Sequence, residues 1–247
     1  MSSTRLASRA VVRLSSSSPS DDPAVFLQGL LTNDVTTPPP TYAALLTAQG
    51  KTMFDMIVWR DGEDILLDCE AAVAEELVKR LSLYRLRRKI AIAVDKRLSV
   101  HWQAAPREGS AADPRLAALG YRWLARTDGP QESADEAWRK HRLALGVPEG
   151  RDELGDTLWL ETNAVELNGV SFNKGCYIGQ ENTARMNWRQ KVNRRLVIVP
   201  IDRSEEKRRK VSHDDLGLAV DHLRVADIAP ELAPEWLDLA PPQDPKP

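Results

Sequence analysis

The chain has 247 residues, of which 42% are hydrophobic and 28% are charged, and its formal net charge is −2. This composition excludes a disordered tail, a collagen-like repeat and a small disulfide-rich scaffold. No segment reaches the roughly 20 consecutive apolar residues of a membrane span. The slightly negative net charge argues against a protein whose whole surface is basic and binds nucleic acid.

The amino-terminal residues allow two interpretations. Arg5, Arg9 and Arg13 lie among many serines without an acid, which is typical of a mitochondrial presequence. The apolar residues within 10–14, followed by a serine-rich turn, instead predict a first β-strand. We favour the strand, with a fold that begins near residue 4 and a cytoplasmic protein.

Further along the chain, the hydrophobic patterning predicts alternating groups of helices and strands. Helices are expected over 24–31, 70–86 and 132–145, and strands over 42–47, 52–59, 65–68, 90–94, 121–125 and 196–201. The segment 203–210 reads as a solvated loop, and the proline-rich end from residue 230 as a loosely held tail. Because the order shows no regular βαβ alternation, the fold class is α+β.

The two cysteines and four histidines show no metal-binding pattern. Cys69 and Cys176 are far apart, the histidines are scattered, and no zinc spacing results. Two cysteines favour free thiols in a reducing compartment. A conventional iron–sulfur cluster takes about four thiolates, so the chain cannot hold one alone. No metal site is predicted.

The densest polar cluster is the octet K-G-C-Y-I-G-Q-E at 174–181. Two glycines near Cys176 predict a tight turn that another group approaches closely. Lys174 could favour the Cys176 thiolate, while Gln180 and Glu181 are suited to binding a heterocycle. The alternative is a glycine-rich turn around a buried, inert cysteine.

Asp55 and two basic runs are weaker candidates. Asp55 follows the predicted turn at 49–50 and could act as a general base or accept a hydrogen bond from a ligand amine, although an exposed turn carboxylate is the more common case. The runs 79–89 and 185–195 contain basic residues and no acid. They could bind a carboxylated ligand, an acidic partner or RNA, or could simply be solvated faces.

The octet resembles the signature of the YgfZ/Iba57 proteins, which are folate-binding relatives of the glycine cleavage T protein, an aminomethyltransferase. Other segments resemble the same family in order along the chain: 26–35, 113–116, 119–120, 141–150 and 169–172. The resemblance implies a bilobed α+β fold around a folate pocket over 1–195. Residues 196–247 would form a shortened carboxyl-terminal β-barrel segment, in which 216–220 resembles a surviving strand, with an acidic, proline-rich tail.

The resemblance also implies a function and site residues. It implies a tetrahydrofolate-binding accessory factor for iron–sulfur protein maturation, with transient assembly or client proteins as partners. Nothing in the sequence calls for more than a monomer. Cys176 would be the functional thiol and Lys174 its neighbouring base. Residues implied to line or support the folate site are Glu161, Tyr177, Gln180, Glu181 and Arg185.

Two departures from the family pattern keep other functions open. The T protein has two adjacent acids where this chain has Phe54-Asp55, and the carboxyl end is short. Loss of one acid argues against true aminomethyl transfer, although a tetrahydrofolate-dependent one-carbon transferase using Asp55 is the alternative. An RNA or protein adaptor acting through the two basic runs is a third hypothesis.

Overall fold

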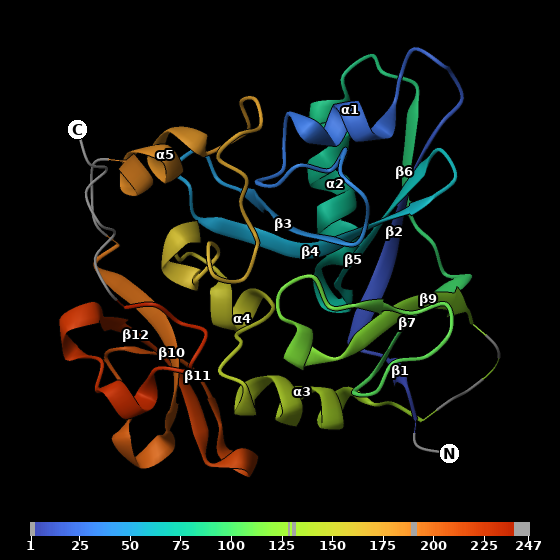
Figure 1. Cartoon of the computed structure of the whole chain (residues 1–247). Coiled ribbons are helices and arrows are strands. Elements are labelled where there is room, and N and C mark those ends of the chain that lie inside the picture. Colours follow the sequence, from blue (N-terminus) through green and yellow to red (C-terminus); the bar gives the residue numbers. More distant parts are fainter. Residues whose placement is uncertain (1–2, 128, 130–131, 189–191, 240–247) are drawn as a thin grey trace.

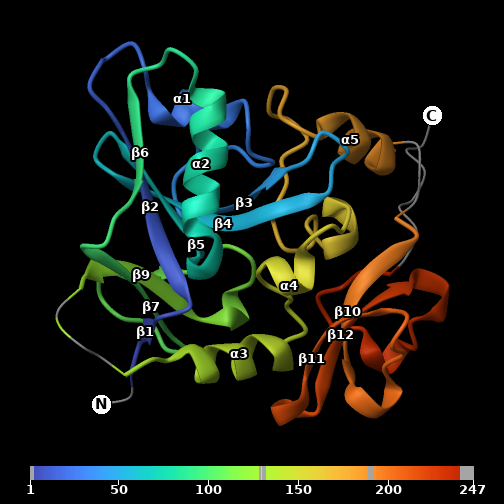
Figure 2. The same cartoon turned by 180° about the vertical axis from the view of Figure 1, so that it is seen from behind.

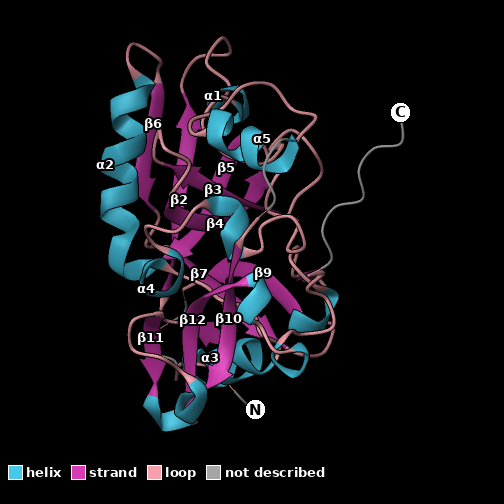
Figure 3. Cartoon of the chain, turned by 90° about the vertical axis from the view of Figure 1, so that its left-hand side faces the viewer, coloured by secondary structure: helices cyan, strands magenta, loops and turns pink. Residues whose placement is uncertain are grey.

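The strands form three antiparallel sheets in residues 3–127, 129, 132–188 and 192–239, which are the part of the chain that the computed structural model describes. The sheets contain five, four and three strands. In Figure 1 the five-stranded sheet fills the upper part of the molecule, and the four-stranded and three-stranded sheets lie side by side below it; Figure 3 shows the same arrangement from the side. Within these residues, no helix combines the length and apolar character needed to cross a bilayer.

The five-stranded sheet has the order β3-β4-β5-β2-β6. Its strands are β2 (Arg9–Ser16), β3 (Thr41–Leu46), β4 (Thr52–Asp61), β5 (Asp64–Glu70) and β6 (Ile90–Val94). The helices α1 (Pro23–Gln28) and α2 (Ala74–Arg85) cover one face (Figure 2). Asp22 caps α1 by accepting a hydrogen bond from the Ala24 amide, with Pro23 in the first turn, as its sequence predicts.

Side-chain alternation gives this sheet two different faces. Val12, Leu45 and Met56 belong to the core beneath α1 and α2. Val11 and Ile57 point the other way, into a larger core shared with the rest of the molecule. Residues on this second face of β4 therefore point toward the centre of the protein.

The four-stranded sheet has the order β1-β7-β9-β8. Its strands are β1 (Arg5–Leu6), β7 (Leu98–Gln103), β8 (Ala111–Ala112) and β9 (Tyr121–Arg126). The helix α3 (Asp135–Ala144) lies beside it (Figure 1). The rings of Trp102 on β7 and Trp138 on α3 pack with their centroids 5.2 Å apart, so aromatic contacts join the helix to the sheet.

The three-stranded sheet has the order β10-β12-β11. Its strands are β10 (Arg194–Pro200), β11 (Arg209–His213) and β12 (Leu218–Arg224). The short helix α4 (Arg151–Leu154), a 3₁₀ helix at Trp159–Thr162 and α5 (Gln180–Trp188) precede it. Among the described residues this sheet stays open and forms no closed barrel.

Several predicted elements need correction. The strand expected at 216–220 begins at Leu218, because Gly217 has a φ of 64° and ends a 3₁₀ turn. The predicted loop 203–210 contains the start of β11, whereas β7 and α5 had not been predicted. Part of the predicted tail is packed: Leu237 is buried, and the Trp236 indole donates to the Leu145 carbonyl. Residues 240–247 lie outside the described residues.

Candidate functional site

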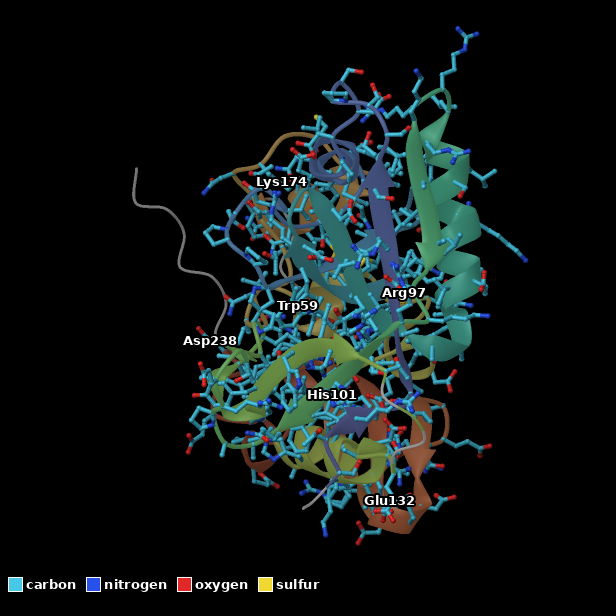
Figure 4. The ribbon with its side chains drawn as sticks, turned by 90° about the vertical axis from the view of Figure 1, so that its right-hand side faces the viewer. Trp59, Arg97, His101, Glu132, Lys174 and Asp238 are labelled. Atoms are coloured by element: carbon cyan, nitrogen blue, oxygen red, sulfur yellow. The ribbon has the colours of Figure 1, made fainter. Side chains whose placement is uncertain are left out.

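The octet is attached to the loop that follows α1. Thr32 begins this attachment, since its carbonyl accepts from the Ser171 amide and its hydroxyl donates to the Gly169 carbonyl. The buried ammonium of Lys174 then donates to the carbonyls of Leu31 and Asn33. The Lys174 side chain therefore binds backbone of the five-stranded region; Figure 4 places it toward the end of the molecule that carries α1.

Burial lowers the pKa of Lys174 to about 8, while the nearby Asp34 carboxylate opposes this shift. The side chain therefore stays mostly protonated at neutral pH and loses its charge as the pH rises through about 8. Because its ammonium is committed to two carbonyls, the first effect of Lys174 is to position the loop. Whether it also acts as a base for Cys176 stays a prediction.

The second glycine of the octet packs against the β3–β4 turn. Gly179 has a φ of +81°, and a Cβ there would lie 2.6 Å from the Thr47 carbonyl oxygen. The Asn182 side chain donates to the Gln49 carbonyl at 2.9 Å, which extends the contact into α5. The predicted close approach is therefore confirmed at Gly179, whereas a Cβ on Gly175 would meet no atom within 4 Å.

Replacing Gly179 by alanine should destabilise the protein. The positive φ alone costs about 1–3 kcal/mol for a residue with a Cβ, and the contact with Thr47 adds to it. Gly175→Ala is the matched control, since its Cβ would point into open space. Thermal unfolding should show a lower Tm for Gly179→Ala and little change for Gly175→Ala; equal Tm values would refute the close packing.

The two cysteines have opposite environments. Cys176 is exposed, whereas Cys69 on β5 is buried, and both are free thiols. Burial raises the pKa of Cys69 to about 12, so this thiol stays protonated and inert. The alternative of a buried, inert cysteine in the octet is wrong, and Cys176 is the thiol that a partner can reach.

The remaining octet residues lie in three environments. Tyr177 is buried, with its ring centroid 5.1 Å from the Lys174 ammonium, and burial raises the pKa of Tyr177. Gln180 begins α5 and is half-buried. Glu181 and Arg185 form an ion pair of 2.8 Å on the exposed side of α5. This pair is committed to itself, so a role for these two residues against folate stays a prediction.

Asp55 lies on the inner face of β4 and is buried, so the exposed-carboxylate interpretation is wrong. Its Oδ2 atom has no hydrogen-bond partner among the described residues. Burial raises the pKa of Asp55 to about 6; Glu149 and Glu70 add to the shift, while Arg9 and Arg115 oppose it. A buried carboxyl that titrates near neutrality is typical of a site that binds or exchanges a proton.

A second unsatisfied polar group lies four residues along the same strand. The indole nitrogen of Trp59 is buried and likewise has no hydrogen-bond partner among the described residues; Figure 4 places Trp59 near the middle of the molecule. Residues 55 and 59 point to one face because strand side chains alternate. This face of β4 therefore carries one acceptor and one donor that no described residue satisfies.

A buried ion network surrounds Asp55, and the sequence analysis did not find it. Arg122 on β9 contacts Asp68 and Asp113 at 2.9 Å each. Arg115 contacts Asp113 and Glu149 at 2.7 Å each. The network is completed by Arg9, which is 2.7 Å from Asp68. Because its members come from the five-stranded and four-stranded sheets and the segments near 113 and 149, the network joins these two sheets.

Glu161 and the basic run 185–195 have protein partners. A Glu161 carboxylate oxygen lies 2.9 Å from Nε2 of His222 on β12, so this side chain faces the three-stranded sheet. Its assignment to the pterin stays a prediction. Arg195 is buried and pairs with Glu166 at 2.7 Å. Residues 189–191 lie outside the described residues.

The sequence matches no established protein-family profile. It is 37% identical over 219 residues to the human mitochondrial iron–sulfur cluster assembly factor IBA57, covering 72% of this chain and 61% of that protein. The mouse protein of the same name is 36% identical over 240 residues, covering 80% and 66%. The chain thus spans slightly less than two thirds of these curated relatives.

A solved structure has the same fold. The glycine cleavage system aminomethyltransferase T from Bartonella henselae matches with a TM-score of 0.60, covering 78% of this chain and 64% of that one, at 13% sequence identity. This match confirms the expected fold type. The cytoplasmic prediction, by contrast, is contradicted, because the human and mouse relatives are described as mitochondrial. The first strand was predicted correctly, but a strand does not determine the compartment.

Proposed function

Because this chain belongs to the YgfZ/IBA57 family, we propose that it is a tetrahydrofolate-binding accessory factor in iron–sulfur cluster assembly and acts through the Cys176 thiol. Iron–sulfur clusters would be its cargo, and the assembly proteins or client enzymes its transient partners. The observation that carries the proposal is an exposed thiol on a loop held at both sides, by Lys174 and by Gly179.

The two attachments give Cys176 a defined position. Lys174 binds the loop to the carbonyls after α1, and Gly179 packs on the β3–β4 turn. The thiol between them reaches solvent without needing the loop to open. A thiolate is a soft ligand for iron and a nucleophile, so a fixed, accessible one suits brief contact with a cluster that a partner holds.

Tetrahydrofolate would bind against the inner face of β4. Asp55 would accept a hydrogen bond from a pterin amine, and Trp59 would donate one to an acceptor on the ring. When bound, the folate would supply amine nitrogens able to carry a one-carbon unit. The residues of this chain would orient it and hold a proton on Asp55, whose pKa of about 6 permits both protonation states in the cell.

The proposal is tested by restoring a cluster-dependent enzyme in cells that lack the gene. Wild type and Cys69→Ala should restore its activity, whereas Cys176→Ala should restore at most a few per cent. Cys176→Ala should reach the same level in the cell as wild type, since Cys176 is exposed and its loss leaves no cavity. Full rescue by Cys176→Ala would remove the thiol from the mechanism, and no effect of gene loss would remove the assembly role.

A one-carbon transferase is the second candidate, favoured by the raised pKa of Asp55. Phe54 argues against it, because this residue is buried in the core on the opposite side of the sheet and offers no second carboxylate. Turnover of a methylamine-type donor with tetrahydrofolate, lost in Asp55→Asn, would establish the transferase. Absence of turnover in wild type leaves the accessory role.

A further inference from the structure

The loop between α2 and β6 carries an exposed leucine in a strained conformation. Leu86 is 84% exposed and has φ 52° and ψ −116°. A bulky residue at positive φ is a rare outlier, since its Cβ meets the backbone. Neither burial nor backbone preference explains why a leucine stands at this position. Strained backbone conformations such as this one are found most often at functional sites.

A second exposed leucine lies one turn earlier. Leu83 on α2 is 68% exposed, whereas Leu77 and Leu81 on the other side of the helix are fully buried. One face of the helix therefore packs into the core, while Leu83 lies on the face exposed to solvent. Lys79, which is four residues earlier and also exposed, lies on the same face of the helix. Figures 1 and 2 show this end of α2 and the following loop at the rim of the molecule, beside α1.

The two leucines lie within the basic run 79–89. Its six cations are Lys79, Arg80, Arg85, Arg87, Arg88 and Lys89. Within the described residues, none of the six forms an ion pair, and Glu76, an acid on the same helix, pairs with Arg151 instead. Arg85, Leu86, Arg87 and Arg88 line, with Asp21, a hollow of about 510 Å³.

The hollow is held in shape. The Lys89 amide donates to the Asp21 carboxylate at 2.9 Å, and the Arg88 guanidinium lies 5.6 Å from the centroid of the Phe26 ring. The Arg85 guanidinium donates to the Ile90 carbonyl. These contacts fix the loop but leave Arg87 and Leu86 directed to solvent, both of them exposed.

We propose that Leu83, Leu86 and the cations around them form a docking surface for an acidic protein segment that carries an apolar side chain. This deepens the proposed function, on which it rests, by giving the transient partner a chemistry. Unpaired cations would meet acidic side chains, and an apolar anchor would cover the leucines.

Charge and composition favour a protein over the other anionic partners. Single-stranded RNA is bound by cations together with aromatic rings on which bases stack, but the exposed apolar residues here are leucines and Tyr84 is half-buried against the core. An anionic membrane would meet Glu75 and Glu76, which are exposed in the first turn of the same helix. An acidic peptide needs no aromatic ring for stacking, and it is small enough to bind the cations at the end of the helix away from the two glutamates.

The test uses fluorescein-labelled 15-residue peptides and the full chain, with binding followed by fluorescence anisotropy. The first peptide is mostly Asp and Glu with Leu at positions 5, 8 and 9; the second replaces these leucines by serine. A uridine 15-mer and phosphatidylserine vesicles are the competing probes. The leucine peptide should bind most tightly, at least tenfold more than the serine peptide, and its affinity should fall as salt is raised.

Three variants and two controls locate the contact. Leu86→Gly keeps the positive φ without strain, so the fold is retained, and its affinity for the leucine peptide should fall at least fivefold. Leu83→Ser and Arg87→Glu should also lower this affinity at least fivefold. Val165→Ser changes an exposed apolar residue elsewhere, and Lys96→Glu an exposed cation elsewhere; both should bind as wild type does.

Each other outcome overturns the inference. No binding of the leucine peptide, tighter binding of the RNA or the vesicles, or unchanged affinity in the three variants would each do so. In the cell rescue, Leu86→Gly should act poorly. If Cys176→Ala fails to rescue but Leu86→Gly rescues fully, the docking surface is refuted while the proposed function stands. If gene loss has no effect, the proposed function fails and the peptide result decides the surface separately.

Discussion

Arg122→Met should lose about 3–5 kcal/mol of unfolding free energy, because it removes one of the two cations that neutralise each of two buried carboxylates. Arg122 is fully buried, and both Asp68 and Asp113 depend on it as well as on one other arginine each. Methionine has a similar length but no charge, so packing against Trp138 is largely kept. A loss of this size is a large share of the stability of a typical domain.

Urea unfolding of Arg122→Met and wild type at pH 7 measures this loss. Arg203→Met is the control, since Arg203 forms a solvent-exposed pair with Glu231 and such pairs contribute little. The midpoint should fall strongly for the first variant and hardly for the second. A loss below about 1 kcal/mol for Arg122→Met would mean that water or neighbouring arginines replace its charge.

Asp55→Asn should stabilise the protein at pH 7 while impairing its function. The Asp55 carboxyl has a pKa of about 6 in the folded state, against about 4 in an unfolded chain. The folded state therefore holds this proton more tightly. Stability from this group is complete below pH 4 and is lost as the pH rises through 6; the loss amounts to about 3 kcal/mol. Asparagine carries no charge and avoids the loss.

The measurement is the free energy of unfolding of both proteins from pH 4 to pH 8. The difference between variant and wild type should be small near pH 4, grow up to about pH 6 and stay level above it. Taking the difference removes the other carboxyls, among them Glu149, whose pKa is lowered by its arginine partners against the effect of burial. A difference that is flat with pH would show that Asp55 is not buried as a charge.

Local patterns predicted the parts of the fold that depend on neighbouring residues. The strand expected at 52–59 is β4 (Thr52–Asp61), and the helix expected at 70–86 contains α2 (Ala74–Arg85). β11 was missed because Arg209–His213 is mostly polar and only half-buried. Its pairing with β12, not its composition, makes it a strand.

The candidate site likewise has parts that depend on neighbouring residues and parts that depend on residues distant in the sequence. The octet is a local motif, so its glycine turn and cysteine could be found in the sequence. The burial of Asp55 could not, because its environment is made by Arg9, Arg115 and Glu149, which are distant along the chain. The Glu181–Arg185 ion pair was missed for a related reason: its i,i+4 spacing brings the two side chains together only once 180–188 is known to be a helix, and that helix had not been predicted.

A three-stranded sheet that does not close leaves two borders where strands of another molecule could add. Here a single stretch of chain, 151–163, occupies both of them. α4 lies along β11, where Glu153 contacts His213, and the 3₁₀ helix lies along β10, where the Asn163 amide donates to the Leu196 carbonyl. The segment that precedes the octet therefore also protects the protein against edge-to-edge association, so mutations in it can cause aggregation without touching the thiol or the folate site.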